Sequence, residues 1–224
     1  MNLSNFNWGP SNQWYIDTIT NEIFSNNCYE KFLNVENGDV VLDFGASIGP
    51  FTFSILNKKP KHVICIEPSL ELFPTLVANT NHGPVTCLNK AIYSDDLTSV
   101  QLGEIYGSEI NILTVPTIKF RSIVDLYNLE KIDFLKTDCE GGEYDIFNVS
   151  NLIWIKGNVK KIVGEWHLGS IEHKQKFREF RDVYLRLFTN YQVYSVDGVD
   201  IKWDLWNDHF IEYYGTIIIH IDNR

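Results

Sequence analysis

Cysteine is scarce in this chain, and its cysteines are far apart. The 224 residues contain only Cys28, Cys65, Cys87 and Cys139, and no two of them form a Cys-x-x-Cys pair. This spacing argues against zinc ribbons and thioredoxin-like redox motifs. Cys65 and Cys87 lie in short apolar runs typical of strands. We therefore expect buried thiols in a reducing compartment, which predicts a cytoplasmic protein.

Basic residues are also in deficit. Nineteen Lys and Arg stand against 29 Asp and Glu, so the formal net charge is -10 at pH 7, and no basic run exceeds two residues. Such a balance repels a phosphate backbone, and we expect no nucleic-acid partner.

Long apolar runs are missing as well. None approaches the roughly 20 residues that span a bilayer, so we expect no membrane segment. Residues 1–10 lack the basic and apolar regions of a signal peptide, and we expect no secretory leader. Repeats and linker-like stretches are absent too, which indicates a single domain.

What the sequence does contain is an alternation of apolar runs and helical stretches. This pattern predicts an α/β fold, in which a mostly parallel sheet carries helices on both faces. We divide the chain into an N-terminal helical segment, 1–36, and a sheet-bearing domain, 37–224. The expected parallel strands are 39–45, 62–67, 85–88, 132–138 and 161–166, and two final strands are expected at 191–196 and 212–221. The expected helices are 12–33 (one or two), 50–57, 69–79, 122–129, 144–155 and 172–188, and region 94–119 reads as short antiparallel strands or loop.

Ligands of such sheets bind beyond the carboxyl ends of the strands, so the residues there carry the chemistry. The first strand ends in Asp43-x-Gly45-x-x-x-Gly49, and Glu67 ends the second. Glycines allow a tight turn close to a ligand, and an acid at the second strand can accept both hydroxyls of a ribose. The loop has Ser47 where a nicotinamide-binding fingerprint would need glycine. Asp43 would repel a pyrophosphate but favour a sulfonium and an ammonium, which indicates S-adenosylmethionine.

A second group of polar residues follows the fourth and fifth strands. Asp138 and Glu140 share one face of an extended chain, as do Glu165 and His167. Neighbouring parallel strands would bring the four side chains together at one rim. Burying such charges unpaired is costly, so the cluster requires a ligand, a cation or mutual pairing. A solvated salt-bridge network with Lys136 is the structural alternative. No spacing dictates a metal ion, and we expect none, although a divalent ion is chemically possible.

These residues resemble the FkbM family of S-adenosylmethionine-dependent methyltransferases. The resemblance covers about residues 38–167, and its most specific part is the fourth-strand signature. The matching segments are Val41–Gly49, with Ser47 where asparagine is usual, Ile66–Pro68, Asp133–Glu143, with Gly142 where alanine is usual, and Glu165–His167.

The resemblance implies a seven-stranded, Rossmann-like class I methyltransferase fold. It also implies O-methylation of a hydroxyl on a sugar, glycan or other small acceptor. The methyltransferase domain would then be residues 37–224. A nicotinamide-dependent oxidoreductase and a non-catalytic module that binds an adenosine ligand are the alternatives.

We expect the following roles. His167 is the expected general base, because a neighbouring carboxylate orients the ring, with Asp138, Glu140 and Glu165 in support. The sequence does not decide whether the helix around Trp14 and Tyr15 covers the cofactor. The expected cofactor contacts are Asp43, Gly45, Ala46, Ser47 and Gly49 on the methionine side, Glu67 and Pro68 at the ribose, Asn89, Ser94 and Asp95 near the adenine, and Asp138 at the methionine ammonium or the acceptor.

Overall fold

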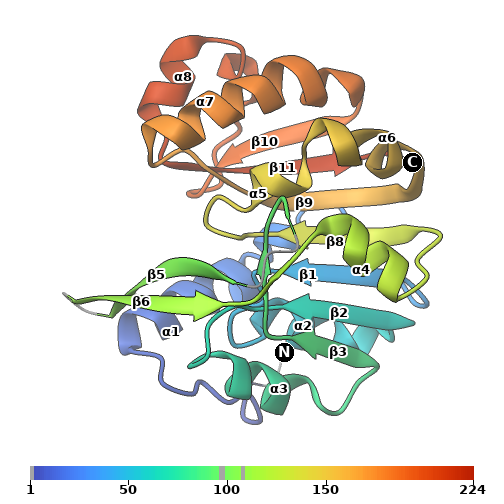
Figure 1. The fold of residues 1–224 in the computed structure, drawn as a ribbon, viewed down its shortest axis with the longest axis vertical. Coiled ribbons are helices and arrows are strands. Elements are labelled where there is room, and N and C mark those ends of the chain that lie inside the picture. The colour runs from blue at the N-terminus through green and yellow to red at the C-terminus, as the bar shows by residue number, and fades with distance from the viewer. Residues whose placement is uncertain (1–2, 96–98, 107–108) are drawn as a thin grey trace.

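The computed structural model describes residues 3–95, 99–106 and 109–224. Its main feature is a seven-stranded sheet with the order β10-β11-β9-β8-β1-β2-β3 (Figure 1). Strands β3, β2, β1, β8 and β9 run parallel, and β11 and β10 are antiparallel additions. The expected α/β class is confirmed. The strand bounds are β1 Val40–Phe44, β2 His62–Ile66, β3 Val85–Leu88, β8 Ile132–Thr137, β9 Val159–His167, β10 Tyr191–Ser195 and β11 Thr216–Asp222.

Two hydrophobic cores lie on the two faces of the sheet. Successive strand residues alternate between them, as the pleat requires: Leu42 packs in one core and Val41 in the other. Side chains from α2, α3 and the N-terminal segment fill the smaller core, and those from α4 to α8 the larger. The helices are α2 Pro50–Ile55, α3 Phe73–Thr80, α4 Phe120–Leu126, α5 Glu143–Ile146, α6 Val149–Asn158, α7 Ile171–Glu179 and α8 Asp208–Tyr213.

Region 94–119 contains the expected antiparallel pair. Strands β5 Val100–Tyr106 and β6 Glu109–Val115 form a hairpin that extends beyond the arrowheads of β1, β2 and β3 (Figure 1). Short strands β4 Ala91–Ile92 and β7 Thr117–Ile118 pair at its base. The hairpin therefore projects on the side where the parallel strands end.

The N-terminal segment is helical, as expected, but in three pieces. Helix α1, Gln13–Ile19, continues as a π-helical turn over 20–25, and a 3₁₀ turn follows at 28–30. Ile23, Leu33 and Val35 of this segment are buried in the smaller core. The segment is thus part of the folded body.

Two predicted elements have limits that differ from those in the structure. The helix expected over 172–188 is α7 only to Glu179, and a π-helical turn and a 3₁₀ turn complete it. The last strand was expected from Glu212 but begins at Thr216, because Asn207 caps a helix that runs to Tyr213. Asn is a strong helix N-cap, and this signal outweighs the aromatic, strand-like composition that follows.

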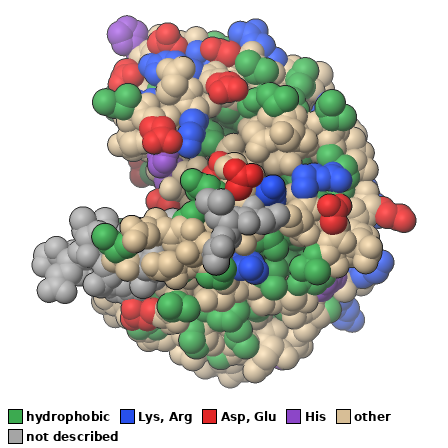
Figure 2. Space-filling view, viewed as in Figure 1, with side chains coloured by type: hydrophobic (Ala, Val, Ile, Leu, Met, Phe, Trp, Pro, Cys, Tyr) green, Lys and Arg blue, Asp and Glu red, His purple; other side chains and the backbone are tan. Residues whose placement is uncertain are grey.

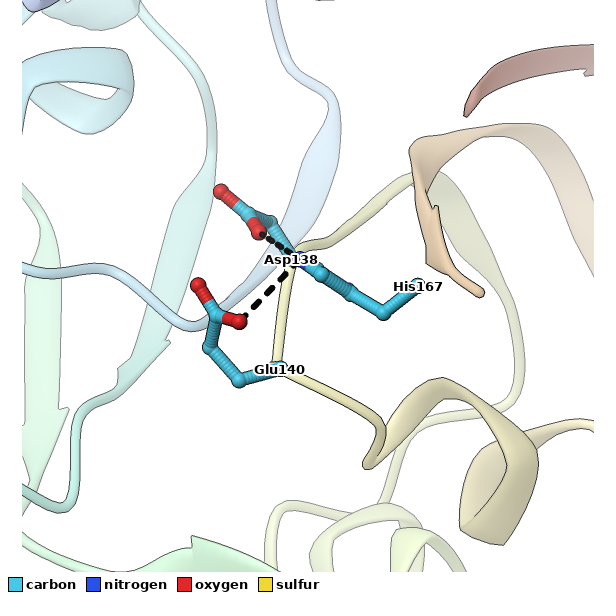
Figure 3. A group of neighbouring side chains, drawn as sticks. All are labelled: Asp138, Glu140 and His167. Atoms are coloured by element: carbon cyan, nitrogen blue, oxygen red, sulfur yellow. Dashed lines mark ion pairs between the residues drawn. The ribbon is translucent and has the colours of Figure 1, made fainter. Parts of the chain in front are cut away.

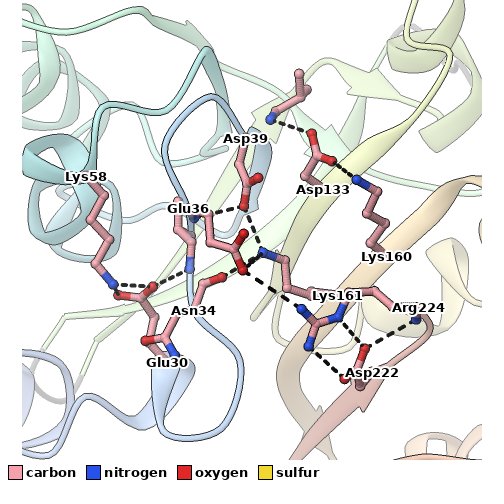
Figure 4. A network of polar contacts seen from close by, with 12 residues as sticks. Glu30, Asn34, Glu36, Asp39, Lys58, Asp133, Lys160, Lys161, Asp222 and Arg224 are labelled. Carbon is pink, nitrogen blue, oxygen red and sulfur yellow. Dashed lines mark hydrogen bonds and ion pairs between the residues drawn. The ribbon is translucent and has the colours of Figure 1, made fainter.

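Charged residues at the amino-terminal ends of the strands are paired with one another (Figure 4). Lys161 is buried, and its Nζ lies 2.8 Å from Asp39 Oδ2 and 2.7 Å from the carbonyl oxygen of Asn34. Lys160 Nζ lies 2.8 Å from Asp133 Oδ1, while Val40 N donates to the other oxygen of that carboxylate. This end of the sheet has few charges left for a ligand.

All four cysteines are free thiols; Cys65 is buried, and Cys87 is half-buried. Among the helices of the described residues, none is long and apolar enough to cross a membrane.

Candidate active site

The glycine loop after β1 lies directly against the end of β2. The backbone N–H groups of Gly45 and Ala46 both donate to the carbonyl oxygen of Ile66, at 3.0 Å each. Glu67 accepts from Ser47 N through Oε2 and from Ser69 N through Oε1, at 2.8 Å in each case. The loop and Glu67, which the sequence predicts to form one site, are therefore in direct contact.

Gly45 is required at its position for two reasons. Its φ is +72°, and a Cβ there would lie 1.7 Å from the carbonyl oxygen of Asp138. Only glycine permits this close approach of the loop to the end of β8. The first and fourth strand ends consequently meet at one point.

Asp43 lies beneath the loop. Its side chain is fully buried; Oδ2 accepts from Thr52 Oγ1 at 2.7 Å, and Oδ1 lies 3.2 Å from Lys136 Nζ. The expected contact of Asp43 with a cationic ligand is therefore corrected. The charge is already paired with a buried ammonium, and the side chain supports the loop from below.

Lys136 joins the first and fourth strands. Its Nζ donates to the carbonyl oxygen of Gly45 at 2.6 Å and lies 3.9 Å from Asp138 Oδ2. Burial lowers the pKa of Lys136, but the charges of Asp43 and Asp138 raise it overall, so the group stays cationic. Because Lys136 is 3% exposed, the alternative of a solvated network around it does not hold.

The residues proposed for the adenine end are only partly brought together. Asn89 Nδ2 donates to the carbonyl oxygens of Glu67 and Pro68, at 2.9 and 3.0 Å. Asn89 and Pro68, both expected to contact the cofactor, thus lie next to Glu67. Ser94 and Asp95 are exposed, and Asp95 Oδ1 pairs with Lys119 at 3.4 Å. This ion pair holds Asp95 next to Lys119, which lies between β7 and α4, rather than next to Glu67 or Asn89.

The four residues expected at the rim of β8 and β9 do meet. His167 Nε2 lies 3.3 Å from Glu140 Oε2 and 3.8 Å from Asp138 Oδ1, and the two carboxylates lie on the same side of the ring (Figure 3). Glu140 reaches the ring from a left-handed backbone conformation, φ +52°, next to two glycines. Glu165 is joined to the group through Tyr29.

Glu143 holds the other side of the imidazole. Its side chain is fully buried and accepts from Cys139 N at 2.6 Å and from Gly141 N at 2.9 Å, while Oε1 lies 3.2 Å from His167 Nδ1. Sequence reasoning assigned no role to Glu143, although it closes the fourth-strand signature. The backbone bonds fix the carboxylate, and the carboxylate fixes the ring.

Tyr29 is a further site residue that the sequence did not reveal. Its hydroxyl donates to Asp138 Oδ2 at 2.9 Å and lies 3.3 Å from Glu165 Oε1. These partners are 109 and 136 residues away, so no local motif signals the contact.

The charge states differ from those expected. Burial would lower the pKa of His167, but the hydrogen bond and charge of Glu143, with Glu140 and Asp138, raise it to about 10. A protonated imidazole cannot accept a proton at neutral pH. Burial and the charge of Asp138 raise the pKa of Glu165 to about 8. Of these two groups, Glu165 therefore titrates nearer neutrality.

Asp138, Glu140 and His167 also offer one ligand atom each within 4.8 Å of one another. Two carboxylates and an imidazole are compatible with a divalent ion. The same atoms are partners in the ion pairs of His167, so the geometry does not require one.

The space-filling view shows a hollow between the C-terminal part of the molecule and the projecting hairpin, with acidic and histidine side chains on its wall (Figure 2). This hollow faces the carboxyl ends of the strands. The amino-terminal ends carry paired charges, whereas this side carries several carboxylates around one imidazole and one buried lysine.

The carboxyl ends of β1 and β2 suit an adenosyl ligand, because sheets of this class bind the ribose at the acidic residue that follows the second strand. Glu67 is fixed at that place by the N–H groups of Ser47 and Ser69. S-adenosylmethionine would lie over the glycine loop, beside Glu67 and near Asp138, and the fully buried Asp43 would not touch it.

Comparisons with known proteins identify the family. The family described as the methyltransferase FkbM domain matches residues 24–195. A search of curated proteins gives no significant sequence match.

Many solved structures share the fold. A candidate rRNA methylase from Clostridium thermocellum has a TM-score of 0.51 at 10% identity, over 95% of this chain and 97% of that one. A TehB-like S-adenosylmethionine-dependent methyltransferase from Corynebacterium glutamicum has a TM-score of 0.45 at 11% identity, over 95% and 100%. At these identities the likeness to the Clostridium structure supports the fold alone.

Proposed function

Because the chain belongs to the FkbM family and is an S-adenosylmethionine-dependent methyltransferase, we propose that it methylates a hydroxyl group of a sugar or another small acceptor. The observation that carries this proposal is the group Asp138, Glu140, Glu165 and His167 at the ends of β8 and β9, here called the rim cluster. Partly buried carboxylates can hold an acceptor by its hydroxyls and take up the proton that it loses.

The cofactor supplies a methyl group on a positively charged sulfur, which is ready for direct displacement. The protein has three tasks: to bind the acceptor close to that carbon, to exclude water, and to accept a proton. We assign binding of the cofactor to Gly45, Ala46, Ser47, Gly49, Glu67, Pro68, Asn89 and Asp138.

Glu165 is the proton acceptor in this proposal. Its pKa of about 8 lies near the working pH, as efficient general-base catalysis requires. His167 then holds Asp138 and Glu140 in place as a cation instead of acting as the base. His167→Ala is expected to retain cofactor binding and to lose turnover, because those carboxylates lose their partner.

The charge of the site favours neutral or cationic acceptors. Asp138 and Glu140 lie beside the same ring, in which His167 is the neighbouring cation, and Lys136 lies between Asp43 and Asp138. A phosphate group would be repelled there, so we propose no nucleic-acid acceptor.

The cofactor half of the proposal is tested by calorimetry with S-adenosylmethionine. Glu67→Ala removes a charged acceptor and is expected to weaken binding by about tenfold or more. Glu71→Ala, an exposed acid four residues further along, is the matched control and should bind as the wild type does. Equal affinity in the wild type and Glu67→Ala contradicts the assignment, and stabilisation by reduced nicotinamide cofactors alone favours the oxidoreductase alternative.

The acceptor half is tested with a panel of neutral sugars, amino sugars, sugar phosphates and RNA. Release of S-adenosylhomocysteine and mass spectrometry of the products are measured. Methylated neutral or amino sugars support the proposal. Products from RNA or sugar phosphates alone contradict it, and cofactor binding without any turnover favours the non-catalytic alternative.

A further inference from the structure

Helix α1 lies beside the glycine loop that follows β1. None of its residues is buried, yet Tyr15 reaches the glycine loop, where its hydroxyl lies 2.5 Å from Ser47 Oγ. Ser47 is also the residue whose N–H binds Glu67. The helix therefore touches the crevice through one side chain.

The tyrosine hydroxyl lies among the charges of the cofactor site. Burial raises the pKa of Tyr15, and Ser47, Lys136, Glu67 and Asp138 all act on it electrostatically or by hydrogen bonding. The hydroxyl thus keeps its proton and can donate a hydrogen bond. Two hydroxyl groups 2.5 Å apart at the glycine loop each have donor and acceptor capacity with which to bind a ligand as well as each other.

The chain is anchored on both sides of α1. Before it, Asn7 N donates to Asn79 Oδ1, and Asn79 Nδ2 donates to the carbonyl oxygen of Asn7, at 2.8 Å each. Phe6 packs edge-on against Phe24 and Phe53. After it, Ile23 is buried in the smaller core.

Between these anchors the helix changes type. The α-helix ends at Ile19, and a π-helical turn runs to Ser25. A π-helical turn is a local departure from regular helical hydrogen bonding and is often found at functional sites. No side chain of α1 is fully buried, although Ile19 at its end packs against the smaller core, so the helix can shift by small amounts between its fixed ends.

We propose that Tyr15 is a cofactor-binding residue and that α1 is the cover of the cofactor crevice. This inference rests on the proposed function. When the crevice is filled, the Tyr15 hydroxyl exchanges Ser47 for a polar group of the ligand, and α1 closes over it. The adenosyl and amino-acid parts are common to S-adenosylmethionine and S-adenosylhomocysteine, so the Tyr15 hydroxyl binds both ligands.

The first test measures dissociation of each ligand from Tyr15→Phe by stopped-flow fluorescence, with affinity by calorimetry. The phenylalanine keeps the ring and removes one hydrogen bond. We expect both ligands to leave about threefold to tenfold faster, the change that a net 0.5–1.5 kcal/mol represents. Tyr213→Phe, the same substitution at an exposed position of α8, is the control and should match the wild type.

The second test follows hydrogen exchange by mass spectrometry. S-adenosylmethionine should slow exchange of the amides in 13–19 in the wild type and have less effect on them in Tyr15→Phe. Helix α7, 171–179, is the internal reference and should not respond. No acceptor is needed for either measurement.

The outcomes separate the two proposals. A wild type that binds neither ligand overturns the proposed function. A wild type that binds them, with dissociation from Tyr15→Phe unchanged or no slowing of exchange over 13–19, overturns the cover and leaves the proposed function standing.

Discussion

At the scale of single residues, the most informative group is Glu165. It is a half-buried carboxylate next to Asp138, and the hydroxyl of Tyr29 lies 3.3 Å from it. Its pKa of about 8 exceeds the ordinary value of 4.5 for a glutamate, so the ionised form is disfavoured in the folded protein. Between these two pH values the folded state binds more protons than the unfolded state, and stability falls as the pH rises.

Glu165→Gln is therefore expected to affect stability and activity in opposite directions at pH 7. The amide is neutral without taking up a proton, so it removes the cost of protonating the carboxyl on folding at pH 7 and should raise the melting temperature by about 2–4 °C for each kcal/mol regained. It also removes the proton acceptor, and turnover should fall by about 100-fold or more. Calorimetric melting and product assays check the two effects; an active variant contradicts the assigned role.

The pH dependence gives a separate test. Activity should rise as the pH passes through about 8, where Glu165 loses its proton, and fall towards pH 10, where His167 loses its charge. The profile of initial rates from pH 6 to pH 10.5 measures both limbs. A profile that rises through pH 6.5, the ordinary range of histidine, would instead support His167 as the base.

At the scale of elements, the pairing of β8 with β9 positions the rim cluster. Thr137 and Gly164 are register partners just before the strand ends that carry Asp138 and Glu165. A Cβ on Gly164 would lie 2.3 Å from the carbonyl oxygen of Thr137 and 2.4 Å from its Cγ2. The two strands can keep their spacing here only if one partner lacks a side chain.

Gly164→Ala should therefore separate the two strands. We expect a loss of stability of about 1–3 kcal/mol and reduced turnover, because the carboxylates of the rim shift relative to each other. Gly157→Ala in α6 is the matched control: a Cβ there meets nothing within 4 Å, and alanine favours a helix. Urea unfolding measures both variants. Equal stability of Gly164→Ala and the wild type would show that the sheet absorbs the extra carbon.

The elements also show what could be predicted from sequence. The parallel strands were predictable because most are apolar runs with both faces buried, as in β2, His62–Ile66, which was expected over 62–67. Helix limits such as Glu179 and Tyr213 were not, since capping and local π-turns decide them. The rim cluster followed from strand parity, whereas Tyr29 and the pairing of Asp43 with Lys136 depend on tertiary contacts.

At the scale of the whole molecule, the N-terminal segment cannot be separated from the sheet. Ile23, Tyr29, Leu33 and Val35 are buried in the smaller core, and Tyr29 also completes the rim cluster. Residues 1–36 and 37–224 are distinct in sequence pattern but share one core.

A chain that begins at Asn37 should therefore fail to fold. The truncation removes several buried apolar side chains and exposes the face of the sheet that packs under α2 and α3. The resulting loss of folding free energy exceeds the usual stability of a domain. Circular dichroism and size-exclusion chromatography of the truncated chain test this. A soluble truncated chain with a cooperative melt would identify 37–224 as an independent domain.

The position of β11 has a consequence for how the protein is made. This strand is formed by residues 216–222, yet it pairs with β9 on one side and β10 on the other. While the ribosome is still adding the residues before it, the outer edge of β9 has no partner, and an open strand edge promotes association between nascent chains. The strand that carries Glu165 and His167 is thus enclosed only after residues 216–222 have been made and have paired with it.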